Sequence, residues 1–152
     1  MSRAGYLLAG GKSSRMGRDK ALLAFRGATL GAHVAAVVAA AAGSVTVVGD
    51  PEKYASLGYP VLPDRTPGTG PLGGIETALD HTGADWNVVV ACDMPTVTAE
   101  FLRELLDAAE HRQADVLLPA GPTGRPEPLV AGVSWPRRTM SAPTEAARGG
   151  VR

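Results

Sequence analysis

The stretch "LLAGGKSSRMGRDK", Leu7–Lys20, decides how the rest of this chain is interpreted. Its apolar start leads directly into Gly10 and Gly11, where the absence of a side chain lets backbone amides approach an anion closely. Two serines and four cations follow within the next nine residues. Because a charge-assisted hydrogen bond contributes roughly 1.5–3 kcal/mol, a few such groups suffice to bind a triphosphate. We therefore interpret the stretch as a strand followed by a phosphate-binding loop, with a solvated glycine-rich turn as the alternative.

The composition indicates one globular domain. The chain has 152 residues, 45% of them hydrophobic, and a formal net charge of zero, which is enough for a core and argues against a dedicated nucleic-acid binder. The longest apolar run, Val34–Ala42, is shorter than the roughly 20 residues of a membrane span. The lone Cys92 cannot form an internal disulfide, which fits a reducing compartment. We expect a cytoplasmic protein that binds neither nucleic acid nor a membrane.

Short, continuous apolar runs predict strands that are covered on both faces of a sheet. They are Tyr6–Ala9, Val45–Val48, Pro60–Leu62, Val88–Ala91, Val116–Leu118 and Leu129–Val133. Stretches that read as helices lie among them: Leu30–Ala42, Pro71–His81 and Glu100–Arg112. Gly43 and Thr98 have the residue types that end the first of these helices and begin the last. The alternation of strand and helix predicts an α/β fold, a three-layer sandwich with a mostly parallel, Rossmann-like sheet.

Ligands of such sheets bind outside the carboxyl ends of the strands, so the residues that follow each strand form the candidate site. Asp64 follows the third predicted strand, where it can either orient a nucleotide or cap the turn. Asp93 follows the apolar strand Val88–Ala91 in "VVVACDMP". Magnesium needs only one or two carboxylates when substrate phosphates complete its coordination. Asp93 is therefore the predicted Mg²⁺ ligand, and capping the turn before Pro95 is its alternative role.

Two other nucleotide fingerprints do not account for this pattern. "GKS" at Gly11–Ser13 lacks the glycine that a P-loop needs five residues earlier, because position 6 is Tyr6. "GTGPLG" at Gly68–Gly73 matches a dinucleotide fingerprint by letter, but Pro63–Pro67 separates it from the preceding strand. No nucleophile with a histidine partner can be assembled either, so the chemistry has to come from the loops.

Five groups of residues, taken together, resemble the motifs of a known family. They are Leu8-Ala9-Gly10-Gly11, Ser14-Arg15-Met16-Gly17, Asp19-Lys20, Asp64 with Gly70-Pro71-Leu72-Gly73-Gly74, and Cys92-Asp93-Met94-Pro95. In this order they resemble the molybdenum cofactor guanylyltransferases, a MobA-like family within the nucleotidyltransferase superfamily. The resemblance extends over residues 4–133, and "GRPEPLVAGV" at Gly124–Val133 is similar to the family's segment near the pterin site.

The resemblance implies an activity: transfer of GMP from GTP to the terminal phosphate of molybdopterin, with release of pyrophosphate and with Mg²⁺ as cofactor. It implies that GTP contacts a set of residues at the first loop, namely Leu8, Ala9, Gly10, Gly11 and Lys20. Asp64 would contact the nucleotide and Asp93 the metal ion, while Arg15 would face the phosphates. Arg15, Lys20 and Asp93 are the implied catalytic residues. GTP and molybdopterin are the implied substrates, and transient contact with other molybdenum cofactor proteins is expected.

The chain also departs from the family pattern in two places. A further nucleotide-contacting position, often Asn in the family, falls within Val48-Gly49-Asp50. The family's additional helix and its Asn-Thr-Pro segment have no counterpart after Ser134. We therefore expect residues 1–134 to form the nucleotidyltransferase domain and 135–152 to be an irregular tail, with the family's C-terminal part missing.

The motifs leave three other functions open. Arg-Met-Gly and Cys-Asp-Met-Pro do not select the base, so a molybdopterin cytidylyltransferase is one alternative. A nucleotidyltransferase for another phosphorylated acceptor is a second. A non-catalytic nucleotide-binding module is a third, favoured if the shorter C-terminal region lacks the acceptor site. Guanine is preferred here by resemblance alone.

Overall fold

The protein is represented by a computed structural model that describes residues 2–10, 19–65, 71–113, 116–117 and 130–134. The elements in the first half of the chain are β1 (Arg3–Leu8), η2 (Lys20–Leu22), β2 (Ala24–Phe25), β3 (Ala28–Thr29), α1 (Leu30–Ala42), β4 (Thr46–Val48), α2 (Pro51–Tyr54), η3 (Ala55–Leu57) and β5 (Val61–Leu62). Those in the second half are α3 (Pro71–His81), β6 (Trp86–Ala91), α4 (Ala99–Arg112), β7 (Val116–Leu117) and β8 (Val130–Ser134). The two η elements are 3₁₀ helices.

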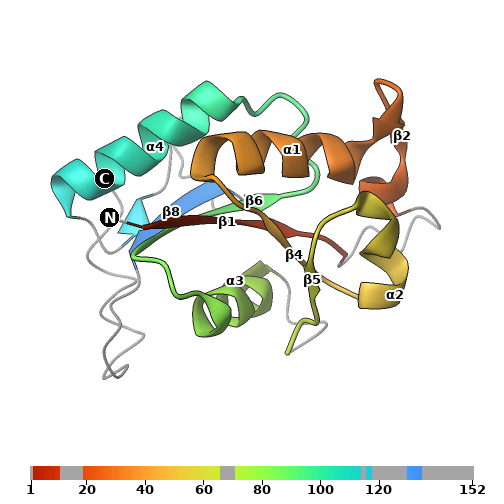
Figure 1. Cartoon of the computed structure of the whole chain (residues 1–152), viewed down its shortest axis with the longest axis horizontal. Helices are drawn as coiled ribbons and strands as arrows, with labels where there is room; N and C mark the ends of the chain where they lie inside the picture. Colours follow the sequence, from red (N-terminus) through yellow and green to blue (C-terminus); the bar gives the residue numbers. More distant parts are fainter. Residues whose placement is uncertain (1, 11–18, 66–70, 114–115, 118–129, 135–152) are drawn as a thin grey trace.

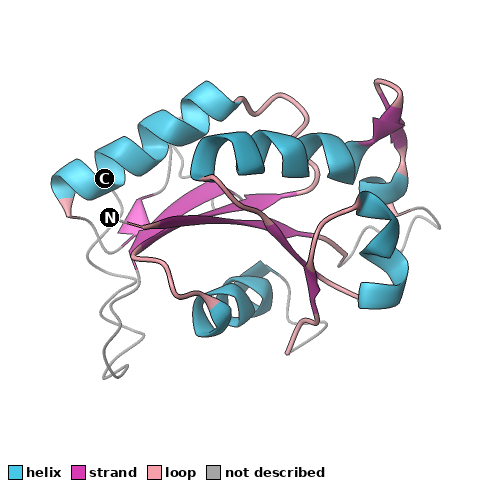
Figure 2. Ribbon diagram, in the orientation of Figure 1, coloured by secondary structure: helices cyan, strands magenta, loops and turns pink. Residues whose placement is uncertain are grey.

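The described residues form a three-layer α/β sandwich around one main sheet (Figure 1). Its strand order is β5-β4-β1-β6-β8-β7, and β5, β4, β1 and β6 are parallel neighbours. Helices α1 and α4 lie on one face of the sheet and α3 lies on the other (Figure 2). The predicted α/β class and mostly parallel sheet are confirmed.

Strand β8 departs from the parallel pattern. It lies between β6 and β7 and is antiparallel to both, with Val88 opposite Gly132 and Val116 opposite Val133. The strand expected at Leu129–Val133 is therefore present as Val130–Ser134, but its direction is reversed. An antiparallel strand can join its neighbour without a crossover helix, whereas a parallel one cannot.

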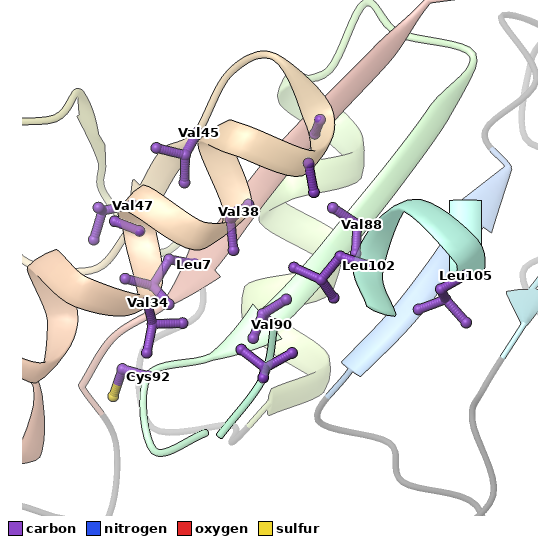
Figure 3. Close-up of a cluster of buried hydrophobic side chains, with 14 of the residues drawn as sticks. Leu7, Val34, Val38, Val45, Val47, Val88, Val90, Cys92, Leu102 and Leu105 are labelled. Carbon is purple, nitrogen blue, oxygen red and sulfur yellow. The ribbon is translucent and has the colours of Figure 1, made fainter. Parts of the chain in front are cut away.

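The strands read as continuous apolar runs because both sheet faces are covered. On one face Leu7, Val88 and Val90 pack against α1 and α4 in the main core cluster (Figure 3). On the other face Tyr6 and Val89 belong to a smaller cluster with residues of α3. Neighbouring residues in a strand thus serve opposite layers, as the two-residue repeat of a strand requires.

Helix bounds follow local capping signals. Helix α1 ends at Ala42, as predicted, and Gly43 caps it with a φ of 86°, a left-handed value that favours glycine. The Thr98 hydroxyl accepts a hydrogen bond from the Phe101 N–H, so α4 begins at Ala99, one residue before the predicted start. Helix α3 also matches its predicted range, Pro71–His81. Among the helices that the structure describes, none combines the length and the apolar character that crossing a membrane requires.

Candidate functional site

The four parallel strands end at one level, and this brings their following loops to one edge of the sheet. The Ala9 N–H donates to the Val48 carbonyl at 3.0 Å, just past the last paired residues of β1 and β4. The Gly49 N–H donates to the Leu62 carbonyl at 2.9 Å, and the Cys92 N–H to the Leu8 carbonyl at 3.1 Å. The segments that carry Asp64, Gly10 and Asp93 therefore all start from the carboxyl edge, where ligands of open α/β sheets bind.

The predicted phosphate loop begins at this edge. Leu8 is the last residue of β1 and Ala9 follows it, and Gly10 is exposed with a φ of +91°, a left-handed conformation that glycine adopts without strain. Gly11 and Arg15 lie outside the described residues, as do the predicted tail and most of the segment that resembles the pterin site. The described chain resumes at Asp19, and Lys20 is the exposed first residue of η2.

The backbone around Lys20 is held by its two neighbours. The Asp19 carboxylate accepts a hydrogen bond from the Ala21 N–H at 3.0 Å and so caps η2. Ala21 is fully buried against α1. A β-carbon at Gly31 would lie only 2.8 Å from the Ala21 carbonyl oxygen, so this close seating of η2 on α1 requires glycine there. The Lys20 side chain is thus carried on an anchored turn.

Asp19 also accepts hydrogen bonds from α2. The Tyr54 hydroxyl donates to its Oδ2 at 2.6 Å, and the Lys53 Nζ lies 2.9 Å from the same oxygen. Burial raises the pKa of Asp19, but the hydrogen bonds from Tyr54 and Lys53 outweigh it, and the net pKa is below the usual value. Burial, followed by the hydrogen bond to Asp19, raises the pKa of Tyr54 far above its ordinary value. At neutral pH the pair is therefore a carboxylate that accepts from a neutral phenol.

At Val48-Gly49-Asp50, the position that the resemblance relates to the nucleotide, Tyr54 and a helix cap account for the local structure. A β-carbon at Gly49 would lie 2.7 Å from Cε2 of Tyr54, so the tyrosine ring occupies that space. The Asp50 carboxylate accepts from the Glu52 N–H at 3.0 Å and caps α2. The short segment that follows β4 thus places the Tyr54 ring next to Gly49, under the edge of the sheet.

Asp64 is held by the first turns of α3. The Thr77 hydroxyl, on a residue that is 2% exposed, lies 3.2 Å from Asp64 Oδ1 and 3.0 Å from the Gly73 carbonyl oxygen. The same hydroxyl accepts from the Arg65 N–H at 3.1 Å. A hydroxyl has one proton and two lone pairs, so it can serve this turn as donor and acceptor at once. Asp64 is half-buried, and its contact with Thr77 restrains the carboxylate.

Asp93 and Lys20 are charged groups at the carboxyl edge, and they differ from Arg3 and Arg65, whose guanidinium groups are paired. Arg3 binds Asp107 at 2.6 Å and Glu110 at 2.8 Å, and Arg65 pairs with Asp80. Within the described part of the chain, Lys20 and Asp93 have no ion pair or side-chain hydrogen bond. Both are exposed at the carboxyl edge. Charged groups left without protein partners at a ligand edge are available for a charged ligand.

Cys92 does not supply a nucleophile. Its side chain is buried in the main core, and burial, followed by the Asp93 charge, raises the pKa of the thiol to about 11. The thiolate is the reactive form of cysteine, so at neutral pH this residue behaves as a small apolar side chain. Among the residues that the structure describes, the candidate chemistry therefore rests on Lys20 and Asp93.

Sequence reasoning missed Tyr54, Lys53 and Thr77. The Asp50-Pro51 pair is a helix-start signal, and it could have predicted the short α2 that carries the first two. Nothing in the local pattern indicates that these side chains reach Asp19, which is 35 residues from Tyr54. Thr77 lies on the buried face of a predicted helix, but its partner Asp64 lies 13 residues away in a loop.

Comparisons with known proteins agree with this architecture. Residues 5–152 match the family model described as a MobA-like NTP transferase domain. A probable molybdenum cofactor guanylyltransferase of Carboxydothermus hydrogenoformans is 40% identical over 124 residues, which make up 82% of this chain and 61% of that protein. A protein of the same name from Deinococcus radiodurans is 38% identical over 125 residues, covering 82% and 64%. The chain thus spans less than two thirds of the length of these curated relatives.

A solved structure shows the same arrangement in three dimensions. The crystal structure of molybdopterin-guanine dinucleotide biosynthesis protein A from Archaeoglobus fulgidus matches with a TM-score of 0.72 and 29% sequence identity. The match covers 95% of this chain and 71% of that one. The similarity therefore includes the parallel strands whose carboxyl ends form the candidate site.

Proposed function

Because this chain belongs to the MobA-like NTP transferase family, we propose that it transfers GMP from GTP to the terminal phosphate of Mo-molybdopterin. The products are the guanine dinucleotide cofactor and pyrophosphate. The names of the relatives from C. hydrogenoformans and D. radiodurans support this activity. The observation that carries it is the pair of exposed charges at the carboxyl edge of β1 and β6, Lys20 and Asp93, which have no ion pair with any residue that the structure describes.

In this reaction an oxygen of the pterin phosphate attacks the α-phosphorus of GTP. A new P–O bond forms between that oxygen and the α-phosphorus. The bond from the α-phosphorus to the oxygen that bridges it to the β-phosphorus breaks, and pyrophosphate leaves with the electron pair. The attacking phosphate is already anionic near neutral pH, so the step needs no general base. The protein has to bring two anions together and stabilise the charge that develops on the leaving group.

The residues of the first loop have defined parts in this proposal. Leu8, Ala9, Gly10 and Gly11 bring the backbone close to GTP at the end of β1. Lys20 offsets the charge on the leaving pyrophosphate, and Arg15 faces the phosphates from the same loop. Asp64, oriented by Thr77, contacts the nucleotide.

Asp93 fits a magnesium ion by its chemistry and its place. Its carboxylate is exposed, and in the described part of the chain no ion pair engages it. Magnesium prefers one or two carboxylates together with substrate phosphate oxygens. Bound there, the ion would neutralise phosphate charge and act as a Lewis acid on the α-phosphate. Mg²⁺ is thus the proposed cofactor and Asp93 its protein ligand.

The proposal also includes the cellular location, the partner proteins and the domain boundaries of the enzyme. We place the reaction in the cytoplasm, in transient contact with other proteins that assemble the molybdenum cofactor. Residues 1–134 form the nucleotidyltransferase domain in this proposal, and 135–152 form a tail.

The direct test supplies the full chain with GTP, Mg²⁺ and Mo-molybdopterin and measures pyrophosphate release and the mass of the pterin product. We expect turnover that falls at least tenfold in Lys20→Ala, because that variant lacks a charge-assisted contact to phosphate. Arg112→Ala is the matched control: it removes one exposed cation at the far end of α4, near the Arg3 end of β1. GTP binding without turnover would instead indicate a non-catalytic nucleotide-binding module.

Base preference needs its own measurement. We expect GTP to bind at least tenfold more tightly than CTP, because a site that hydrogen-bonds one base leaves buried polar groups unpaired with the other. Competition between GTP and CTP for the Mg²⁺-loaded protein measures the ratio. Equal or CTP-favoured binding would assign the chain to cytidylyl transfer.

A further inference from the structure

A buried phenol lies directly behind the candidate phosphate site. Tyr54 is 1% exposed, and it lies against the chain at Gly10 and Gly49, two loop positions of the carboxyl edge. A β-carbon would lie 3.3 Å from its hydroxyl oxygen at Gly10 and 2.7 Å from its Cε2 at Gly49. The ring therefore fills the space under the ends of β1 and β4, and its hydroxyl is directed to the start of η2.

The Tyr54 hydroxyl has a different role from the ring, because it binds the Asp19 carboxylate. Its hydrogen-bond partner is Oδ2 of Asp19, at 2.6 Å, whereas the other oxygen of that carboxylate accepts from the Ala21 N–H at 3.0 Å. The Asp19 carboxylate thus connects Tyr54 to the residues on both sides of Lys20, because it belongs to Asp19 and binds the Ala21 N–H. A phenylalanine would fill the same space but could not hold this carboxylate.

Lys53 is the weaker of the two donors to Asp19. Its side chain is 42% exposed, whereas that of Asp19 is 8% exposed. An ion pair with an exposed cation is screened by solvent and costs side-chain entropy, so it restrains the carboxylate less than a buried hydroxyl does. Tyr54 is therefore the group that sets the orientation of Asp19.

We propose that Tyr54 is a positioning residue for the triphosphate: through Asp19 it holds the turn that presents Lys20 to the phosphates at the carboxyl edge of the sheet. The inference rests on the proposed function, because it needs Lys20 to contact GTP. It adds a residue that touches neither substrate nor metal. Its effect on GTP therefore passes through Lys20.

The test is a double-mutant cycle on the affinity of the full chain for GTP in the presence of Mg²⁺. Tyr54→Phe keeps the ring and removes the hydroxyl, and we expect it to weaken GTP binding about tenfold, as loss of a hydrogen bond to a charged group does. In the Lys20→Ala background the same change should weaken binding less than about twofold, because the group that it positions is gone. Tyr59→Phe is the matched control, since the half-buried Tyr59 makes no side-chain hydrogen bond within the described residues.

Asp19→Asn gives a second arm if Tyr54→Phe melts below the assay temperature. The amide oxygen can still accept from Ala21, but the charge that binds Tyr54 and Lys53 is lost. We expect a similar loss of GTP affinity and the same lack of effect in the Lys20→Ala background. If the loss of GTP affinity in either variant adds fully to the loss in Lys20→Ala, the contacts of Asp19 with Tyr54 and Lys53 act on the fold and not through Lys20. That result would overturn the inference.

The cycle separates this inference from the proposed function. If Lys20→Ala leaves GTP affinity unchanged, the phosphate site at Lys20 is wrong and the positioning role is wrong with it. If Lys20→Ala weakens binding but a folded Tyr54→Phe binds GTP like the wild type, the positioning role alone is overturned. The expected pattern, a loss in each single variant and no further loss in the double variant, supports both.

Discussion

The ring of Tyr54 occupies the space that a side chain at Gly49 would need. A β-carbon at that position would lie 2.7 Å from Cε2 and 2.8 Å from Cδ2 of the ring. Real β-carbons do not approach ring atoms so closely, so either the ring or the end of β4 would have to move. The absence of a side chain at Gly49 and the orientation of Tyr54 are therefore one structural feature.

Gly49→Ala should consequently destabilise the protein by about 1–3 kcal/mol, the usual cost of overpacking a rigid site. Displacement of the ring should also weaken GTP binding, because the Tyr54 hydroxyl would move from Asp19. Chemical denaturation and a GTP titration measure the two effects. Gly83→Ala is the control, because a β-carbon there meets nothing within 4 Å. Equal stabilities of the two variants would show that the ring yields without cost.

Asp93→Asn tests the metal assignment. The amide keeps the shape of the turn but removes the negative charge that a hard cation requires. We expect turnover to fall at least a hundredfold at any Mg²⁺ concentration that supports the wild type, while the melting temperature of the metal-free protein changes little. Glu104→Gln, on the exposed side of α4, is the matched control. Wild-type dependence on Mg²⁺ in Asp93→Asn would make Asp93 a turn residue.

Thr77→Val tests how Asp64 is held. Valine has nearly the same shape but cannot donate to Asp64 or Gly73, nor accept from the Arg65 N–H. Loss of a buried hydroxyl with such partners costs about 1–3 kcal/mol. We expect that loss of stability in denaturation, together with weaker GTP binding. Thr77→Ser, which keeps the hydroxyl, should retain GTP affinity, and similar losses in both variants would argue for packing alone.

The dependence of stability on pH should report the Asp19 network. The pKa of Asp19 is lowered in the folded protein because the hydrogen bonds from Tyr54 and Lys53 outweigh burial, which raises it. The stabilisation is thus present above the unfolded pKa of about 4 and is lost as the pH falls further, through the folded pKa. This stabilisation should be lost between about pH 5 and pH 3. Over that range, the denaturation midpoint should fall less steeply with decreasing pH in Tyr54→Phe than in the wild type. Parallel curves would show that the hydroxyl does not depress this pKa.

Much of the fold follows from local patterns of the sequence. The bounds of α1 and α3 were predicted correctly, and Thr98 and Gly43 cap the helices that they were expected to cap. Strands β1 and β6 begin earlier than the apolar runs, at Arg3 and Trp86, because those two residues pair with each other across the sheet. Such pairing depends on a partner strand and is absent from the pattern of either strand alone.

The sequence by itself determined which loops reach the ligand edge, because strands joined by helices must run parallel and end on the same side. Gly10, Asp64 and Asp93 could therefore be identified as candidate site residues from the sequence alone. Their roles toward GTP and Mg²⁺ stay predictions. Lys20 was found in the same way, from its place in the loop after β1.

Only the tertiary structure decided how these candidates are supported. It set β8 antiparallel between β6 and β7, it brought Tyr54 to Asp19, and it placed the Thr77 hydroxyl against Asp64. The physical reason is that hydrophobic periodicity and capping act within a few residues, whereas these contacts join segments that meet only after the sheet has formed. A buried hydroxyl leaves no periodic signal in the sequence, and its partner is known only once the chain has folded around it.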